Sequence, residues 1–320
     1  MNKKRLTILS ICAALTLTAC GGSGIGGDSG IGGITRGGNR VEAKISEPPS
    51  DAPQTISLKL DVDAPGTVEE RNDVAVIDYS HTEDGYVMMQ YTEMTDLKLK
   101  AQVKGPETTY TYNLEPQVWA AFPLSDGDGY YQFSVFENVA DSKYALVLDT
   151  DCEVEMSDEF APFLRPNQFV DYADAPLAVA TAKELAYDET LDTVCSVYDF
   201  VTSYLSYDKE KAATVQSGYL PVLDRTLEEK QGICFDYASL MTGMLRSLGI
   251  PCRLVVGYAG DAYHAWISTY IEDKGWVNGI VEFNGNSWVL MDPTLASSLA
   301  ERELRSYIGD GSKYIIRFEY

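Results

Sequence analysis

The chain has 320 residues, of which 48 are acidic and 25 are basic, so its formal net charge is −23. Proteins that bind nucleic acid need a basic footprint, and this charge balance therefore excludes nucleic acid as a partner. Hydrophobic residues make up 45% of the chain, as in a globular protein, and the length allows two modest domains.

Residues 1–19 predict a secretion signal. Basic residues at positions 3 to 5 precede an apolar run that is too short to span a bilayer. The run ends at Cys20, which has small residues on both sides, and this pattern resembles a bacterial lipoprotein signal. The resemblance implies that Cys20 is lipidated and becomes the new N-terminus. We therefore expect a lipid-anchored protein on the extracytoplasmic face of the cell membrane, with an ordinary secretion signal as the alternative.

Residues 20–72 predict a flexible tether. Glycine is frequent up to Gly38, three prolines follow between positions 48 and 53, and the apolar residues show no period. Such a composition cannot bury enough apolar surface to offset the entropy lost on ordering.

Residues 73–165 predict an antiparallel β-sandwich of the immunoglobulin type. Runs that alternate apolar and polar residues recur between turn-forming clusters, and six or seven strands at this spacing fit that architecture. His81, with Glu83 and Asp84, is expected in a solvated loop rather than in a metal site. The clearest expected strands are 74–79, 85–91, 97–104, 108–114, 129–137 and 143–149.

The second domain is expected at 170–320, after a proline-rich boundary. Helical periodicity predicts helices at 176–186 and 191–205, and the mixed segment 207–229 is expected to be loop-like. Cys195 shares the apolar face of the second helix and is interpreted as a core residue.

Cys234 is the candidate nucleophile. It begins a helical run that ends at Gly249, and Pro251 prevents its continuation. A helix N-terminus carries unpaired N–H groups and partial positive charge, which favour a thiolate and can hold an oxyanion. Gln231 and Tyr219 precede Cys234 and are candidates for a second oxyanion donor, because each has a hydrogen-bonding head group.

Two further residues complete a candidate catalytic set. His264 lies in an alternating run from 263 to 271, and Asp292 ends a strand that follows a hairpin signal, the Asn-Gly pair at 284–285. Two adjacent antiparallel strands would then present His264 and Asp292 to the helix of Cys234. A thiol, an imidazole and a carboxylate can form a nucleophile, its base and the group that orients the base.

These blocks resemble the transglutaminase-like superfamily of papain-type thiol enzymes. The resemblance covers about 171–300 and rests on four blocks, Gly232 to Ala238, Leu248 to Tyr258, His264 to Trp266 and Trp288 to Thr294. It implies an α+β domain in which the helix of the nucleophile packs on an antiparallel sheet. It also implies that Cys234 is the nucleophile, His264 the general base and acid, and Asp292 the orienting carboxylate, in acyl transfer from an amide through a thioester.

The expected fold class is therefore α+β, with an N-terminal sandwich followed by a transglutaminase-like domain. No cofactor or metal is expected, and the substrate is expected to be a protein or peptide amide, a cell-wall peptide included. The motifs do not separate an acyltransferase from a peptidase or an amidase. Two alternatives stay open: a catalytically silent module that binds or supports, and a zinc site formed by the three candidate residues, although structural zinc usually takes four ligands.

Overall fold

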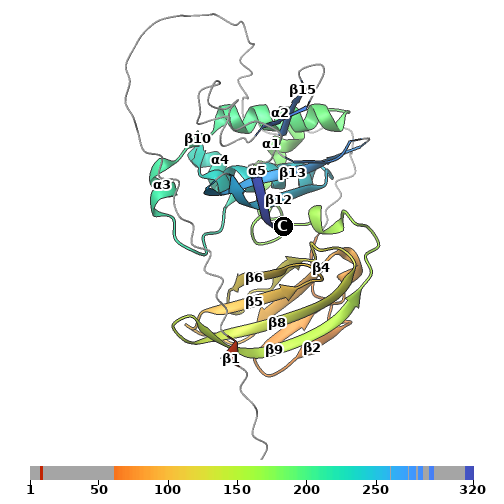
Figure 1. The fold of residues 1–320 in the computed structure, drawn as a ribbon, viewed down its shortest axis with the longest axis vertical. Helices are drawn as coiled ribbons and strands as arrows, with labels where there is room; N and C mark the ends of the chain where they lie inside the picture. The colour runs from red at the N-terminus through yellow and green to blue at the C-terminus, as the bar shows by residue number, and fades with distance from the viewer. Residues whose placement is uncertain are drawn as a thin grey trace, which may run out of the picture.

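The computed structural model describes residues 61–259, 261–272, 274–278, 280–283, 288–291 and 314–320, together with the strand β1 (Ile8–Leu9). Cys20, most of the expected signal and tether, and Asp292 lie outside the described residues. Figure 1 shows a β-sandwich in its lower half and a helix-rich part above it, with the C-terminus at their junction. Within the described ranges, no helix combines the length and apolar character that a bilayer crossing needs.

Two antiparallel sheets form the lower part. The first has the order β2-β3-β4-β7, and the second has the order β1-β9-β8-β5-β6. Buried side chains from both sheets, such as Ile77 and Phe133, belong to the hydrophobic core. The strands are β2 (Glu69–Arg71), β3 (Ala75–Asp78), β4 (Tyr86–Tyr91), β5 (Leu99–Lys104), β6 (Thr109–Leu114), β7 (Ala120–Pro123), β8 (Gly129–Ala140) and β9 (Lys143–Val154).

The strand order does not confirm the expected immunoglobulin type. In that fold the chain changes sheet between its second and third strands, whereas here β2, β3 and β4 follow one another in one sheet. Alternating runs and turn signals locate strands, but a short turn does not determine which sheet the next strand joins. The six expected strands all occur, and β2 and β7, which are short, were not expected.

The end of the expected tether belongs to the sandwich. The strand β2 lies within the range 20–72 and pairs with β3 through its backbone. Gly66 N also donates to the Asp78 carboxylate at 2.6 Å. The sequence Glu-Glu-Arg of β2 has no apolar alternation, so the residue pattern gave no signal for a strand there.

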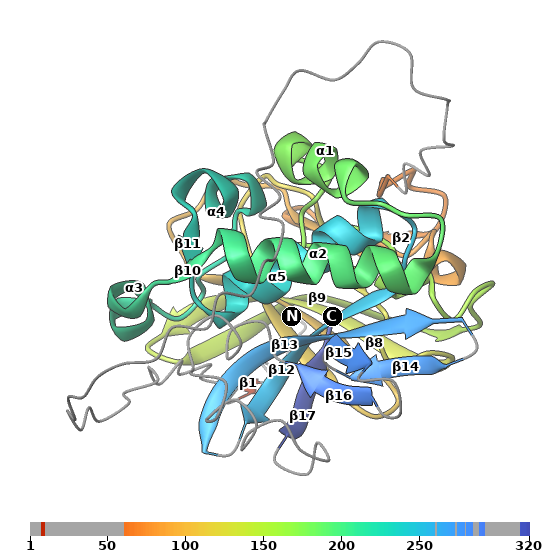
Figure 2. The same cartoon turned by 90° about the horizontal axis from the view of Figure 1, so that it is seen from above.

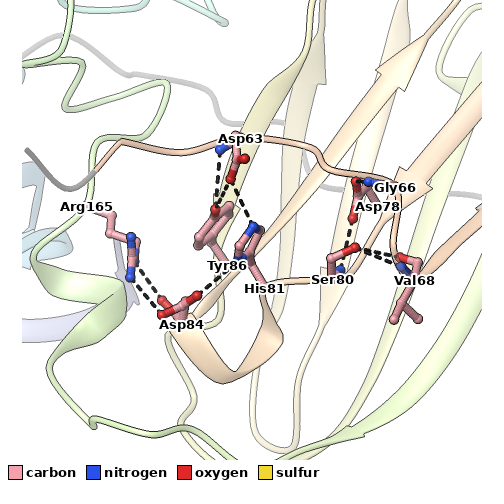
Figure 3. Close-up of polar contacts among 9 residues, drawn as sticks. All are labelled: Asp63, Gly66, Val68, Asp78, Ser80, His81, Asp84, Tyr86 and Arg165. Carbon is pink, nitrogen blue, oxygen red and sulfur yellow. Dashed lines mark hydrogen bonds and ion pairs between the residues drawn. The ribbon is translucent and has the colours of Figure 1, made fainter.

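Figure 3 shows how a polar cluster ties the sandwich to the segment that follows it. The His81 ring lies 2.9 Å from each of two carboxylates, those of Asp63 and Asp84, and its side chain is only 28% exposed. Arg165, beyond the last sandwich strand, donates to the Asp84 backbone oxygen at 2.8 Å and to its carboxylate at 3.0 Å. His81 is therefore more enclosed than the expected solvated loop, because an acidic residue eighteen positions earlier, Asp63, lies against it.

The upper part is built around one buried helix, α5 (Cys234–Ser247). It packs on β12 and β13 on one side and on α1, α2 and α4 on the other, and Figure 2 shows α2 and α5 over these strands. The other helices of the described chain are η1 (Thr82–Asp84), which lies between β3 and β4 of the sandwich, η2 (Ala161–Phe163), α1 (Pro176–Glu184), α2 (Thr190–Tyr204), α3 (Lys209–Thr214) and α4 (Leu223–Glu229). The strands are β10 (Ser206–Tyr207), β11 (Gln231–Gly232), β12 (Cys252–Ala259), β13 (Ala262–Ile271), β14 (Gly275–Asn278), β15 (Ile280–Phe283), β16 (Trp288–Met291) and β17 (Tyr314–Glu319).

The segment 207–229, expected to be loop-like, contains α3 and α4. Asp208 caps α3, since its carboxylate accepts from Lys211 N at 2.9 Å. Asp224, in the first turn of α4, accepts from the first turn of α1 at Leu177 N and Ala178 N. Helices of six and seven residues are too short for a clear apolar period, so the residue pattern gave no signal for them.

The strand of His264 and the β15–β16 hairpin belong to separate sheets. β13 pairs with β12 and β14 in the sheet β14-β13-β12-β17, whereas β16 pairs with β15 in a two-stranded sheet. The hairpin of β15 and β16 was expected and forms, but among the described residues neither of its strands pairs with β13, the strand of His264. Hairpin signals define a pair of strands and do not define the neighbour of that pair.

Aromatic side chains join the sandwich to the second domain. Tyr110 and Tyr112 of β6 contact the Tyr320 ring with centroids 5.6 and 5.8 Å apart, and Phe169 contacts the same ring at 4.7 Å. Phe169 also contacts Phe235, the residue after Cys234, at 5.6 Å. The hydrophobic core is therefore continuous from β6 to the first turn of α5.

Candidate active site

Cys234 is the first residue of α5. Ile233 precedes the helix with extended backbone geometry, and its N–H donates to the Asp236 carboxylate at 2.8 Å. The first helical hydrogen bond runs from Tyr237 N to Ile233 O, which leaves the N–H groups of the first turn without helical partners. Cys234 is 7% exposed and forms no disulfide. The position matches the expected one, at a helix end that favours negative charge.

His264 lies on β13, in register with Gly257 of β12. Its ring stacks on Trp266 with centroids 6.3 Å apart, so the two side chains share a face of the strand as the alternation predicts. A Cβ on Gly257 would lie 2.0 Å from the Ile315 backbone oxygen of β17, so only glycine allows β17 to approach β12 this closely. His264 is 6% exposed, and its strand lies between β12 and β14 in the sheet.

Cys234 and His264 line the same cavity, which has a volume of about 80 Å³. They are thirty positions apart in the chain, and the packing of α5 on β13 brings them to one site. Phe169, Phe235, Val256 and Ala265 give the cavity a largely apolar lining. Asp292, the third predicted member of the set, lies outside the described residues.

Of the two candidate oxyanion donors, Tyr219 lines this cavity and Gln231 does not. Gln231 is exposed on β11 and lines a separate depression with Asp208 and Arg225. The Tyr219 hydroxyl donates to Asp236 Oδ1 at 2.5 Å and accepts from Lys211 Nζ at 2.6 Å. A hydroxyl that donates its proton to Asp236 cannot donate it to an oxyanion at the same time.

Tyr219, Asp236 and Lys211 instead form a polar cluster under the first turn of α5. Lys211 Nζ lies 2.8 Å from Asp236 Oδ2, and the Asp236 side chain is fully buried. Burial and the adjacent Asp236 carboxylate raise the pKa of Tyr219, so its phenol stays protonated at neutral pH. The cluster fixes the segment that carries Tyr219 against the helix that begins with Cys234.

Several residues that line the cavity were not predicted from the sequence. Tyr263 is adjacent to His264, so its proximity could have been noticed. Lys100, Thr111 and Asn113 come from the sandwich strands β5 and β6, and no pattern in the sequence connects them with Cys234. The sandwich is thus a wall of the candidate site as well as a neighbouring domain.

The other cysteines have different surroundings. Cys252 is fully buried on β12, where its sulfur lies 3.5 Å from the Thr269 hydroxyl. Cys152 and Cys195 are half-buried, and burial together with acidic neighbours raises the pKa of both thiols. All four described cysteines are free, so none of them forms the disulfide that an exported protein would permit.

Comparison with known families identifies the domain. Residues 179–279, which include Cys234 and His264, match the family model of the transglutaminase-like superfamily. This part of the chain has a transglutaminase-like fold. It carries the helix of Cys234 and the sheet of His264 in the arrangement that the resemblance predicted.

Two relatives match over part of this chain. The uncharacterized protein YebA from Bacillus subtilis is 29% identical over 110 residues, covering 28% of this chain and 15% of YebA. A protein-glutamine gamma-glutamyltransferase from Pseudomonas aeruginosa is 28% identical over 127 residues, covering 34% of this chain and 17% of the relative. The chain therefore spans less than a fifth of the length of either relative.

Among solved structures, the ethylmercury-bound periplasmic domain of TgpA from Pseudomonas aeruginosa is similar to this chain. It has 17% sequence identity and a TM-score of 0.33 over 64% of this chain and 92% of that domain.

Proposed function

We propose that the protein is a membrane-anchored, extracytoplasmic thiol enzyme that transfers or hydrolyses an acyl group at a protein or peptide amide. The observation that carries the proposal is the shared cavity of Cys234, at the N-terminus of α5, and His264, on β13. The match to the transglutaminase-like superfamily over residues 179–279 supports the same chemistry.

In the proposed reaction, His264 takes the proton of the Cys234 thiol, and the sulfur attacks the carbonyl carbon of the amide. The N–H groups in the first turn of α5 stabilise the negative oxygen that forms. The C–N bond then breaks, His264 gives its proton to the departing nitrogen, and a thioester remains on Cys234. Asp292 is proposed to orient the His264 ring.

An amine or a water molecule completes the proposed reaction. His264 removes a proton from this second nucleophile, which attacks the thioester carbon, and the C–S bond breaks to return the Cys234 thiol. The largely apolar lining of the cavity disfavours water, and the name of the Pseudomonas relative, a protein-glutamine gamma-glutamyltransferase, favours transfer to an amine. We therefore place acyl transfer first and hydrolysis second.

The location is proposed from the start of the sequence. The basic and apolar residues before Cys20 and the glycine-rich stretch after it support a lipid anchor and a spacer. In membrane-extracted protein, the intact mass should lack residues 1–19 and include acyl chains, and Cys20→Ala should release the protein from the membrane. If residues 1–19 are retained both in the wild-type protein and in Cys20→Ala, the proposed anchor is contradicted.

Alkylation by iodoacetamide tests the proposed site. Cys234 should react first at neutral pH, ahead of Cys152 and Cys195, whose thiol pKa values are raised by burial and acidic neighbours. His264→Ala should slow the Cys234 reaction about tenfold or more, because the thiolate loses its partner. Tryptic mapping by mass spectrometry gives the rate at each cysteine.

Two results would contradict the thiol enzyme. One is faster labelling of Cys152 or Cys195 than of Cys234, and the other is an unchanged Cys234 rate in His264→Ala. Either would favour the silent binding module instead. Incorporation of a fluorescent primary amine into a glutamine-containing protein, with release of ammonia, would then separate transfer from hydrolysis in the active protein.

A further inference from the structure

The wall that the sandwich contributes to the cavity carries a lysine. Lys100 of β5 and Asn113 of β6 are directly opposite each other in the antiparallel pairing, and Lys100 Nζ donates to Asn113 Oδ1 at 2.6 Å. Both residues line the cavity together with Cys234 and His264. Among the described residues that line the cavity, Lys100 and His264 alone have an ionisable side chain that is neither a phenol nor a thiol.

Lys100 has no carboxylate partner among the described residues. The chain has 48 acidic and 25 basic residues, so most lysines are expected to have a carboxylate nearby, and a half-buried lysine without one is unusual in this chain. Burial and the nearby Lys98 lower the pKa of Lys100, which is the effect of an ammonium group whose charge is not compensated. An anionic ligand group would supply that compensation.

Three residues that line the cavity each have a buried hydrogen-bonding atom without a partner in the described part of the chain. These atoms are the Gln168 side-chain nitrogen and the hydroxyls of Tyr112 and Tyr263. Burial raises the pKa of both tyrosines, that of Tyr263 to about 12, so each hydroxyl keeps its proton at neutral pH. Buried polar groups are almost always paired, and donors that share one cavity and lack partners indicate a ligand with acceptor oxygens.

The contact between the sandwich and the second domain closes this wall. Gly218, with φ of 88°, lies so near β6 that a Cβ would be 2.5 Å from the Asn113 side-chain nitrogen. The segment of Gly218 and Tyr219 thus holds Asn113, and through it the Lys100 ammonium, next to the site of Cys234. The geometry is set by packing of both domains rather than by a mobile surface side chain.

We propose that Lys100 is a specificity-determining residue, which binds a carboxylate of an acidic peptide substrate while the neighbouring amide reacts at Cys234. Neutral donors of the cavity bind the remaining acceptor oxygens of the peptide. This inference rests on the proposed function, since it assigns the substrate class of the same site. It also gives the N-terminal sandwich a role, which is to supply the charge that the transglutaminase-like domain lacks at this cavity.

Two matched alkylating probes test the inference. They are the α-amides of N-iodoacetyl-glutamate and N-iodoacetyl-glutamine, which differ only in a carboxylate against a carboxamide. Cys234 sulfur displaces iodide from either probe, so the ratio of the two rates reports recognition of the carboxylate. In the full-length protein we expect the anionic probe to react about five to ten times faster, the effect of one partly exposed charge pair.

Lys100→Met should reduce this ratio to that of an unfolded peptide containing the cysteine, and Lys100→Arg should retain most of it. Lys98→Met is the matched control. Lys98 lies two positions before Lys100, carries the same charge, is exposed and does not line the cavity. The preference should appear in the probe concentration that gives half the maximal rate. It should also weaken between about 0.05 M and about 0.5 M salt.

The outcomes separate this inference from the proposed function. Equal ratios in wild type and Lys100→Met, with Cys234 still reactive and dependent on His264, would overturn the role of Lys100 and leave the thiol enzyme intact. Equal loss of the ratio in Lys98→Met would overturn it as well, since the effect would then be a general field. Cys234 that is unreactive in every variant would contradict the proposed function itself, and with it the inference. Circular dichroism and the melting temperature of each variant confirm that the proteins compared are folded.

Discussion

The two ends of helix α5 are both buried, but they treat their polar groups in opposite ways. At the C-terminal end, Arg246 is 1% exposed and donates to the backbone oxygens of Cys252, Arg165 and Tyr320 at 2.8, 2.7 and 2.5 Å. About 18 Å away along the helix axis, Cys234 opens onto a cavity. Three residues that line that cavity each have a buried polar atom with no partner within the described residues.

This difference separates stability from function within one element. Arg246 joins β12, the segment after the sandwich and the end of the last strand, and every contact is satisfied by the fold itself. Burial lowers its pKa to about 10, so it stays charged at neutral pH at some cost in desolvation. The unsatisfied groups at the other end of the helix are also desolvated, but no hydrogen bond within the protein offsets this cost. Such groups are expected where a ligand completes the hydrogen bonding.

The largest expected effect is at the structural end. Arg246→Met keeps much of the side-chain volume but removes a buried donor from the backbone oxygens of Cys252, Arg165 and Tyr320, of which the Tyr320 oxygen still accepts from Leu254 N. We expect a loss of about 3 to 5 kcal/mol in the free energy of unfolding, measured by denaturant titration. Arg253→Met is the control, since Arg253 is partly exposed, pairs with Glu319 at 3.2 Å and stacks on Trp276.

For Arg253→Met the expected loss is about 1 kcal/mol, the range of an exposed ion pair with a cation–π contact. Similar losses in the two variants would contradict the view that Arg246 is the main connection between these three segments. The Cys234 alkylation rate in Arg246→Met, measured well below its melting temperature, should change less than its stability, because the two ends are far apart.

A smaller effect is expected at the polar cluster under Cys234. Tyr219→Phe removes the donor to Asp236 and the acceptor of Lys211, and Asp236→Asn removes the ion pair with Lys211. Each should lower the free energy of unfolding by about 1 to 2 kcal/mol and slow alkylation of Cys234 several-fold. Because the residues act as one unit, the double variant should be little worse than either single variant.

The same variants distinguish positioning from oxyanion binding. Tyr187→Phe is the control, since Tyr187 is 63% exposed and outside the cavity. Alkylation forms no oxyanion, so a Tyr219 hydroxyl that acted only on an oxyanion would leave the alkylation rate of Tyr219→Phe at that of Tyr187→Phe. That result would reinstate Tyr219 as an oxyanion candidate.

Much of the candidate site could be predicted because its signals are local. A helical run begins directly after Gln231-Gly232-Ile233, a segment that does not favour helix, and this alone places Cys234 at a helix N-terminus. Alternation from Tyr263 onward places His264 and Trp266 on one face, as the structure confirms. The order of the strands in the sandwich and the position of the β15–β16 hairpin could not be predicted in this way. They depend on pairing between distant segments, which produces no periodic pattern in the sequence.

Contributions of the sandwich to the cavity could not be predicted for the same reason. Lys100 and Asn113 read as the outward-facing residues of two half-buried strands, and that reading of their local structure is right. Only the approach of the Gly218 segment to Asn113 turns this outward face into a wall of the site. A contact between residues more than 100 positions apart is decided by the packing of two domains, which hydrophobic patterning does not encode.

The smallest expected effect concerns the protonation of Lys100, and it refines the distinction between the two ends. Burial, and after it Lys98, lower the pKa of Lys100 below its ordinary value near 10.5. The preference for the anionic probe requires the ammonium form, so it should be complete at neutral pH and should disappear as the pH rises through this lowered pKa. The window lies below 10.5, where the hydroxyls of Tyr112 and Tyr263 keep their protons.

Lys98→Met should move the midpoint of this loss to higher pH, because it removes the like charge and leaves burial unchanged. Stability has the opposite dependence: the unfolded chain binds the Lys100 proton more tightly than the folded one, so the free energy of unfolding rises with pH across the same window. The measurement is the ratio of the two probe rates between about pH 7 and about pH 11, in which the reactivity of the sulfur cancels. A midpoint at or above 10.5 in the wild type would mean that the cavity does not destabilise the ammonium form of Lys100. The inference would then lose its reason for a carboxylate ligand at this lysine.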